Sequence, residues 1–449
     1  MKHLANRNAV ALAILLPAAV PSQAATAAND TDARIEALSQ QLEALRAEVE
    51  SLRAEQRRQA VDAAASPTAV PPAPAAPTEM AVAVAARDAS SQFDGSPITF
   101  TGYGEAIYTQ PTEGPGDAIA DLQRVVFGLG YRFDDSTRLE VEAEYEHAVT
   151  SADDGGEVAI EQAYIAHQVT DSMQVRAGLF LIPMGIINEV HEPPLFFGVF
   201  RPFTETAIIP STWREGGVSL SGTNDFGLNW NVGVTTGFNL ANWDPTSLDG
   251  QESPLGSIHQ EMSFAVANDL SGYVSLKYIG TPGLTLGAAV FTGGAGQDQK
   301  GFPANDSQAT IWSTYANWSP GRWNLTALYA EGYLSDTAAL NLTYVGNPSL
   351  VPKRFWGGYG QVAYRGWSFG QWRLEPFARY EMFNTGSEYA NIGQGLTPRP
   401  RPTEDVTTLG ASLFLTPNIV FKLDYQFFGE PDAALGYENR LNLGVGYMY

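Results

Sequence analysis

The sequence predicts an all-β fold, a 16-stranded antiparallel transmembrane β-barrel, preceded by an N-terminal periplasmic coiled-coil helix. Three observations lead to this prediction. From Ile98 onward the hydrophobicity has a period of two, short and long connections alternate, and the last strand stops at an aromatic residue. That strand, 437–449, carries on one face the apolar residues Leu441, Leu443, Val445, Tyr447 and Tyr449. An apolar face that ends in an aromatic girdle is typical of bacterial outer-membrane barrels.

Residues 1–24 have the features of a secretory signal peptide. Lys2 and Arg7 are basic, Ala9 to Val20 is a short apolar run, and small residues around Ala24 suit cleavage. The apolar run is too short to span a bilayer as a helix, and no later segment approaches ~18 uncharged apolar residues. We therefore expect export to a soluble compartment or to the outer membrane of a Gram-negative bacterium.

The composition narrows the possible partners and the stabilising chemistry. The chain has no cysteine, so no disulfide framework is expected. Its formal net charge of -23 argues against nucleic acid and anionic lipid as partners. The 19 tyrosines, 22 phenylalanines, 9 tryptophans and 44 glycines fit strands with aromatic belts and tight turns.

Residues 30–58 are predicted to form a coiled coil. Apolar residues recur there at spacings of three and four, and the seam consists of Ile35, Leu38, Leu42, Leu45, Val49 and Leu52. Glu48 and Arg53 would form an attractive pair in a parallel assembly. A helix that is merely amphipathic is the alternative, since three heptads are marginal for an isolated coil. The residue types at the seam do not decide between a dimer and a trimer.

Residues 59–97 are predicted to be a semi-extended linker. The stretch from Ala60 to Ser96 is rich in alanine and proline and has no core-forming pattern. The barrel domain is therefore expected over 98–449.

The period-two region divides into sixteen candidate strands. Each has about the length that a tilted membrane-spanning strand requires. They are 98–110, 120–133, 137–149, 157–169, 172–180, 213–221, 225–238, 270–280, 283–293, 308–318, 321–333, 354–367, 369–383, 404–416, 418–428 and 437–449.

The connections between these strands fall into two alternating classes. Short turns such as 134–136 and 281–283 alternate with longer segments such as 181–212 and 239–269. Short periplasmic turns and long external loops are the pattern of an outer-membrane barrel. The alternation places both ends of the barrel on the short-turn side, where the linker and coiled coil would lie in the periplasm.

Several strands have one charged face and one apolar face. In 138–146, Glu140, Glu142, Glu144 and Glu146 alternate with Leu139, Val141, Ala143 and Tyr145. The same split recurs around Arg373, Glu375, Arg379 and Glu381, and around Lys422 and Asp424. The solvated side of an ordinary antiparallel sheet is the alternative. The opposite faces are too aromatic for a soluble surface, which favours a polar lumen.

Three segments resemble the phosphate-selective porin O/P superfamily: Val175-Arg-Ala-Gly-Leu-Phe-Leu-Ile-Pro-Met-Gly185, Phe200-Arg-Pro202 and Trp213-Arg-Glu-Gly-Gly-Val-Ser-Leu-Ser-Gly222. With its coiled coil, the layout is similar to the dicarboxylate-associated porins of that superfamily. The resemblance implies a homotrimer of sixteen-stranded channels, each narrowed by a third loop folded into the lumen.

The chain departs from the phosphate channels in its basic residues. Lysine occurs only at positions 2, 277, 300, 353 and 422, and inward arginines do not form a run. The sequence therefore does not predict phosphate selectivity.

The third long connection, 181–212, carries the predicted constriction. Its candidate residues are Glu189, His191, Glu192, Arg201, Glu205 and, at its exit, Arg214. The candidate pore wall consists of Arg124, Arg132, Glu140, Glu142, Glu144, Arg176, Arg373, Arg379 and Lys422. Acidic loop residues that face wall arginines would create a transverse field. In the alternative, these charges only pin the loop to the wall.

The sequence predicts a channel and no enzyme. His191-Glu192 lacks the second histidine of a zinc protease, no histidine lies in a nucleophile motif, and neither a metal nor a cofactor is expected. The favoured function is passive diffusion of small charged solutes through the lipid bilayer. Small organic anions such as dicarboxylates are favoured by the resemblance, whereas the acidic excess favours cations. The alternative function is a structural tether that contacts the cell wall through the coiled coil.

Overall fold

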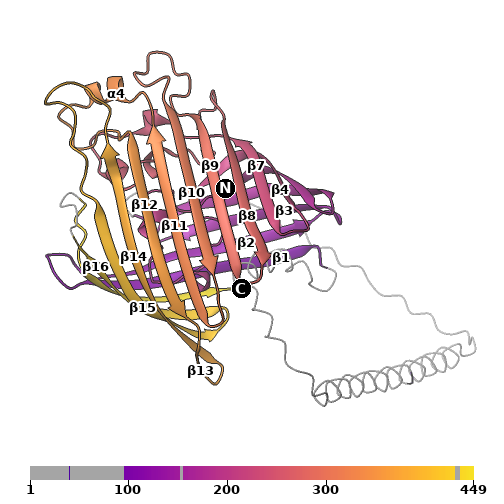
Figure 1. Cartoon of the computed structure of the whole chain (residues 1–449). Coiled ribbons are helices and arrows are strands. Elements are labelled where there is room, and N and C mark those ends of the chain that lie inside the picture. The colour runs from indigo at the N-terminus through magenta and orange to yellow at the C-terminus, as the bar shows by residue number, and fades with distance from the viewer. Residues whose placement is uncertain (1–39, 41–95, 152–154, 430–434) are drawn as a thin grey trace, which may run out of the picture. The chain divides into compact units, whose positions relative to one another are not determined.

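The computed structural model describes residue 40 and residues 96–151, 155–429 and 435–449. The predicted signal peptide and coiled coil, and nearly all of the predicted linker, lie outside these residues, apart from residue 40. The described part of the barrel domain is one continuous antiparallel sheet (Figure 1).

The sheet consists of seventeen strand segments within the described residues. They are β1 (Ile98–Pro111), β2 (Ile119–Arg132), β3 (Thr137–Glu146), β4 (Glu157–Thr170), β5 (Met173–Leu181), β6 (Arg214–Thr223), β7 (Leu228–Thr235), β8 (Ser271–Thr281), β9 (Leu284–Gly294), β10 (Gln308–Trp318), β11 (Trp323–Leu334), β12 (Arg354–Tyr364), β13 (Trp367–Phe369), β14 (Trp372–Glu388), β15 (Glu404–Thr416), β16 (Ile419–Phe428) and β17 (Arg440–Met448). Both β12 and β13 pair with β14, so they occupy one strand position and the barrel has sixteen strands.

The first and last strands close the sheet. Strand β1 pairs with β2 on one side and with β17 on the other, and Tyr103 lies opposite both Val126 and Met448. At the end of this seam, the amide of Gly102 donates to the carbonyl of Tyr449 (3.1 Å), and the amide of Tyr449 donates back (2.9 Å). A closed sheet leaves no unpaired edge, which is the condition for spanning lipid with strands.

The connections have the predicted alternation. The short turns between β8 and β9 and between β10 and β11 contain Gly283 and Gly321, whose φ angles of 76° and 63° favour glycine. The long connections carry the short helical elements, which are η1 (Pro193–Leu195), η2 (Phe203–Glu205), η3 (Leu240–Asn242), α3 (Asp249–Glu252), η4 (Gly256–Ile258) and α4 (Ala338–Thr343). In Figure 1, α4 lies at the end opposite to β13.

The predicted strand positions are confirmed, with differences at a few ends. Strand β3 ends at Glu146 instead of 149, because His147 takes a φ of 58° and leaves the extended region. The predicted strand 354–367 is interrupted, and β14 runs to Glu388, five residues beyond its predicted end. The following loop is correspondingly shorter than predicted.

Side chains alternate between the two faces of the wall. On β16, Val420, Lys422 and Asp424 are buried, whereas Phe421 and Leu423 are exposed. On β3, Glu144 is buried and Tyr145 is exposed. Because successive residues of a strand point to opposite faces, the charged faces line the inside of the barrel and the apolar faces line its outside.

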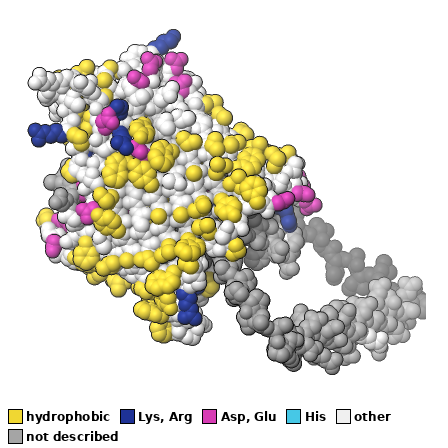
Figure 2. All heavy atoms as spheres, in the orientation of Figure 1, with side chains coloured by type: hydrophobic (Ala, Val, Ile, Leu, Met, Phe, Trp, Pro, Cys, Tyr) yellow, Lys and Arg dark blue, Asp and Glu magenta, His cyan; other side chains and the backbone are white. Residues whose placement is uncertain are grey.

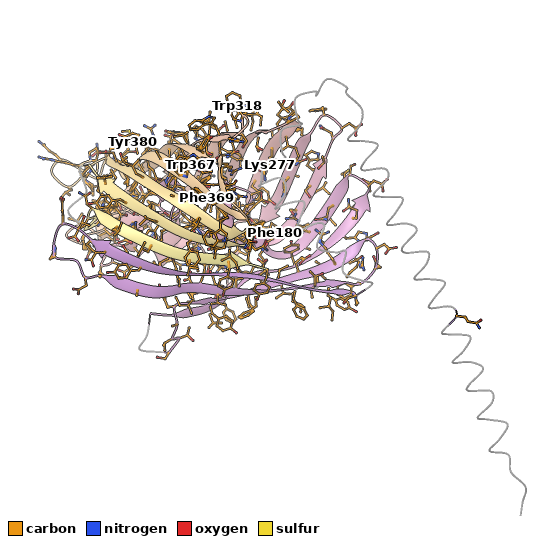
Figure 3. The ribbon with its side chains drawn as sticks, turned by 90° about the horizontal axis from the view of Figure 1, so that it is seen from below. Phe180, Lys277, Trp318, Trp367, Phe369 and Tyr380 are labelled. Carbon is orange, nitrogen blue, oxygen red and sulfur yellow. The ribbon has the colours of Figure 1, made fainter. Side chains whose placement is uncertain are left out.

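Exposed aromatic residues gather at the short-turn end. They are Phe100, Phe133, Phe226, Trp318, Trp323, Trp367, Phe369, Trp372 and Tyr449. Figure 2 shows hydrophobic side chains in a band over this end of the wall, and Figure 3 labels Trp318, Trp367 and Phe369. Aromatic rings of this kind lie at the boundary between lipid and water in membrane proteins. Among the described residues, no helix is long and apolar enough to cross a membrane.

The assignment of faces on β3 predicts opposite effects at adjacent positions. Val141→Arg places a charge on the outer face, and we expect it to reduce the free energy of unfolding by about 2–4 kcal/mol if the residue lies near the bilayer midplane. Glu142→Gln keeps an oxygen that accepts from Gln162 on the inner face, so its effect should be small. Denaturant unfolding in lipid vesicles measures both variants. Equal tolerance at the two positions would contradict the assignment.

Candidate functional site

The loop between β5 and β6, residues 182–213, lies against the inner face of the barrel wall. The amide of Gly185 donates to Ser313 on β10 (3.2 Å), and Tyr359 on β12 donates through its hydroxyl to Glu205 (2.6 Å). Further along the loop, the amide of Val199 donates to Asp424 on β16 (2.5 Å). These strands are widely spaced around the barrel, so the loop crosses the lumen, in agreement with the predicted inward fold.

The apolar residues of the loop explain why it is buried inside the barrel and not exposed to water. Ile182, Met184, Ile208 and Trp213 are almost fully buried in a cluster that also contains Phe291 of β9. Trp213 packs edge-on against Phe291, with ring centroids 4.6 Å apart. Burial of large apolar side chains offsets the conformational cost of ordering a long segment.

Glu205 organises the backbone of the loop. Its carboxylate accepts from the amides of Ile186 (2.6 Å) and Ile187 (2.7 Å) and from the hydroxyl of Tyr359 (2.6 Å). Burial raises the pKa of Glu205, while these three donors act in the opposite direction. Glu205 therefore braces the loop, and the prediction that it faces wall arginines is wrong.

His191 connects the loop to β4. Its Nε2 atom lies 2.7 Å from Oε1 of Glu161, and both side chains are fully buried. The hydroxyl of Tyr103 donates to the other oxygen of Glu161 (3.4 Å), and the Tyr103 and His191 rings meet edge to face at 5.4 Å. The histidine thus belongs to a buried network between the loop, β1 and β4.

Glu161 was not predicted as a site residue, although the sequence contains a signal for it. The register of β3 and β4 shifts between Glu142 and Ala143, so Glu161 is an extra residue in a β-bulge. The exposed residues Val158 and Ile160 are followed by Ile165, an odd spacing that marks the change of face.

The wall arginine Arg124 pairs with carboxylates of the wall itself. Its guanidinium lies 3.0 Å from Glu105, 3.0 Å from Glu144 and 3.5 Å from Glu146. Arg124 thus bridges carboxylates of β1 and β3 and balances one of their three negative charges. The predicted opposition of Arg124 to the acidic loop residues is therefore not what the structure shows.

The other charged residues of the predicted site have varied positions. Glu189 of the loop pairs with Lys277 of β8 at 3.2 Å, a partner that the sequence did not suggest. Figure 3 labels Lys277. Arg176 donates to Gln174 (3.1 Å) and stacks over Tyr164. Exposed Arg132 is the last residue of β2, at the short-turn end.

Four further predicted residues also lie on the inner face or in the loop. Glu140 pairs with Arg138 at 3.3 Å, Glu142 accepts from Gln162, and Arg373 pairs with Glu375. Glu192 is buried next to η1.

Arg379 of β14 is an anchor for the loop. Its guanidinium donates to the carbonyls of Phe197 (3.0 Å) and Phe200 (3.4 Å) and to Glu381 (2.8 Å). Glu381 in turn accepts from the amide of Phe203 (2.8 Å). These contacts favour the alternative in which charges pin the loop to the wall.

Arg214 does not belong to the constriction. It shares a strand face with Val218, which is exposed on the outside of the barrel, and it pairs with Glu261 at 2.9 Å. Alternation along β6 therefore directs Arg214 away from the lumen. The sequence analysis placed Arg214 at the exit of the constriction loop, whereas it is the first residue of β6, where strand alternation sets its direction.

Two cations at the inner face keep polar atoms without a protein acceptor. Arg201 of the loop is 8% exposed and contacts Ser211 through one nitrogen, while its Nε and Nη2 atoms have no hydrogen-bond partner. Lys422 of β16 is 5% exposed, and its Nζ lies 3.5 Å from the ring centroid of Phe196 with no hydrogen-bond acceptor. Lys422 interacts electrostatically with Arg201, Glu105 and Asp424.

The buried contact between His191 and Glu161 predicts a non-additive response to substitution. His191→Leu leaves a buried carboxylate without its partner, and we expect a loss of about 3–5 kcal/mol in the free energy of unfolding. The double variant with Glu161→Leu removes the stranded charge and should recover part of this loss. Denaturant titration in detergent compares the two. A double variant that is the less stable of the two would contradict the pairing.

Comparison with known proteins gives one relative in sequence and several in structure. No family model matches the chain. An uncharacterized protein of Aquifex aeolicus is 30% identical over 339 residues, which cover 73% of this chain and 75% of the relative. The solved OmpF of Salmonella typhi, in complex with daunomycin, has a TM-score of 0.54 at 17% identity over 79% of this chain and 98% of that one.

A second solved structure, the outer membrane channel DcaP of Acinetobacter baumannii, has a TM-score of 0.49 at 12% identity over 78% of this chain and 97% of that one. The likeness to OmpF shows that the fold is a porin-like barrel. By its sequence, the chain belongs to the same family as the uncharacterized Aquifex aeolicus protein.

Proposed function

We propose that this protein is an outer-membrane porin, a water-filled channel for passive diffusion of small charged solutes, with a preference for small organic anions such as dicarboxylates. The closed sheet, the polar inner face and the exposed aromatic belt support a location in the outer membrane. The inner loop supports selectivity, because a segment that crosses the lumen narrows the path of a solute.

The observation that carries the anion preference is the pair of incompletely satisfied cations, Arg201 and Lys422. A buried cation without an acceptor is costly. The positive charge of these two side chains lowers the energy of an anion in the adjacent lumen. Acidic groups of the inner face are paired with wall cations, as Glu105 and Glu144 are with Arg124, which reduces the negative potential that they contribute to the lumen. Exposed acidic residues farther than ~8 Å are screened by salt.

The membership in the phosphate-selective porin O/P superfamily is part of the same proposal. Two of the segments that carry the resemblance, 175–185 and 213–222, span most of β5 and β6 on either side of the inner loop. Their place at the loop is the arrangement that the resemblance implies. The scarcity of lysine favours organic anions over phosphate.

Neutralisation of the two cations predicts a change in ion selectivity. Arg201→Gln and Lys422→Gln should each shift the reversal potential in a potassium chloride gradient towards cation preference, because each removes a positive charge from the lumen. Arg322→Gln, at an exposed position in the short turn between β10 and β11, is the matched control and should leave the potential unchanged. Planar-bilayer recordings of purified protein measure all three.

Two results would contradict this proposal. If the channel prefers cations and neither substitution changes that preference, the proposed anion selectivity is wrong. If the folded protein conducts no current, the proposed channel function is wrong, and the structural tether becomes the favoured function.

The homotrimer belongs to the proposal: the family resemblance implies three subunits, and the coiled-coil seam in the sequence would hold them in parallel. Oxidation of Leu45→Cys should crosslink subunits in native membranes, because Leu45 lies at a seam position. Ala47→Cys lies at an outward heptad position and is the matched control. Gel electrophoresis without reductant resolves the products. Equal crosslinking at both positions, or at neither, would count against a parallel coil.

A further inference from the structure

The segment 259–266, in the long connection between β7 and β8, has an unusual backbone. Glu261, Met262 and Phe264 have φ angles of 51°, 59° and 50°. Left-handed conformations are unfavourable for residues with a β-carbon, and three of them within four residues must be held by surrounding contacts. Such strain at a surface segment indicates that the conformation presents particular side chains.

One glutamine side chain closes this segment into a small loop. The amide nitrogen of Gln260 donates to the carbonyls of Gly237 (2.7 Å) and Val266 (3.0 Å), and its oxygen accepts from the amide of Val266 (2.8 Å). Glu261 is held by Arg214 at 2.9 Å and by His259 at 3.1 Å. The polar residues thus point to the base of the loop and leave its apolar residues at the tip.

The tip lies against the outer wall of the barrel. Gly216 faces outward together with Val218, and a β-carbon at Gly216 would overlap the sulfur of Met262. Met262 therefore packs on the outside of β6, next to the face that meets lipid.

The apolar side chains at the tip have little protein cover. Phe264 is fully exposed and Met262 is 53% exposed. Val218 of β6 and Val234 of β7, a directly paired couple, are each 54% exposed on the neighbouring wall. The tip thus extends the apolar outer surface beyond the strands at the long-loop end.

We propose that the tip formed by Met262, Ser263 and Phe264 inserts into the lipid of the outer leaflet and anchors the rim of the barrel. Two apolar side chains on a polar base match the chemistry of an interfacial anchor. The tip consists of only two apolar side chains, too few to bury the ~800 Å² per partner of a stable protein interface, so it does not form such an interface by itself. The inference needs a barrel that spans the bilayer and is independent of what the channel conducts.

Since the chain has no cysteine, a single cysteine at this tip can be labelled selectively. Phe264→Cys, carrying an environment-sensitive fluorophore, is reconstituted as the full-length protein into phosphatidylcholine vesicles with brominated acyl chains. Lys300→Cys, at an exposed position of the next long loop, is the matched control. Heat-modified mobility on a gel verifies that both variants fold.

If the tip inserts into lipid, brominated lipid should strongly quench the fluorophore at position 264, and aqueous iodide should quench it weakly. Position 300 should show the reverse. Gln260→Leu removes the side-chain hydrogen bonds that close segment 259–266 into a loop, so it should reduce lipid quenching at position 264. Iodide quenching at 264 equal to that at 300 would overturn the proposal. Protection from both quenchers would also overturn it, and would point to cover by a second copy of the chain.

Discussion

The pairing of β1 with β17 is the constraint on which the rest of this structure depends. In lipid, an unpaired backbone amide or carbonyl has no water to bond with, so a sheet that spans the bilayer must close. Closure brings the two ends of the barrel domain together at Gly102 and Tyr449. It also separates an inner face from an outer one, and each strand must then alternate in polarity. The charged lumen and the aromatic outer belt follow from this single requirement.

Closure creates a second problem, because sixteen strands enclose more space than their own side chains fill. The loop between β5 and β6 occupies part of this space. It is held by apolar burial around Trp213 and by charged groups that bond its backbone, such as Glu205, Arg379 and Glu381. Other charged groups at the inner face, Arg201 and Lys422 among them, keep side-chain nitrogen atoms without a hydrogen-bond partner.

The two ends of the outer face differ in the side chains that they expose. Most of it consists of aliphatic and aromatic side chains that lipid can surround, with aromatic residues concentrated at the short-turn end. At the other end, the side chain of Gln260 closes segment 259–266 into a loop. This loop has left-handed backbone angles and exposes apolar side chains. Arg214 supports that segment from the outer side of β6, although it lies only one residue from the buried inner-loop residue Trp213. A single residue step along a strand thus separates the lumen from the lipid.

The sequence by itself determined the number of strands, their approximate positions and the alternation of short turns with long connections. These features depend on local periodicity and turn chemistry, which each segment carries alone. Only the tertiary structure decided which charges meet. Glu161 faces His191 because a bulge changes the face of β4, and Arg124 meets Glu105 and Glu144 because of the register of three strands. Such contacts depend on strand register and on the path of a loop through the lumen. The order of residues along one strand specifies neither, although the odd spacing of outward residues on β4 marks its bulge.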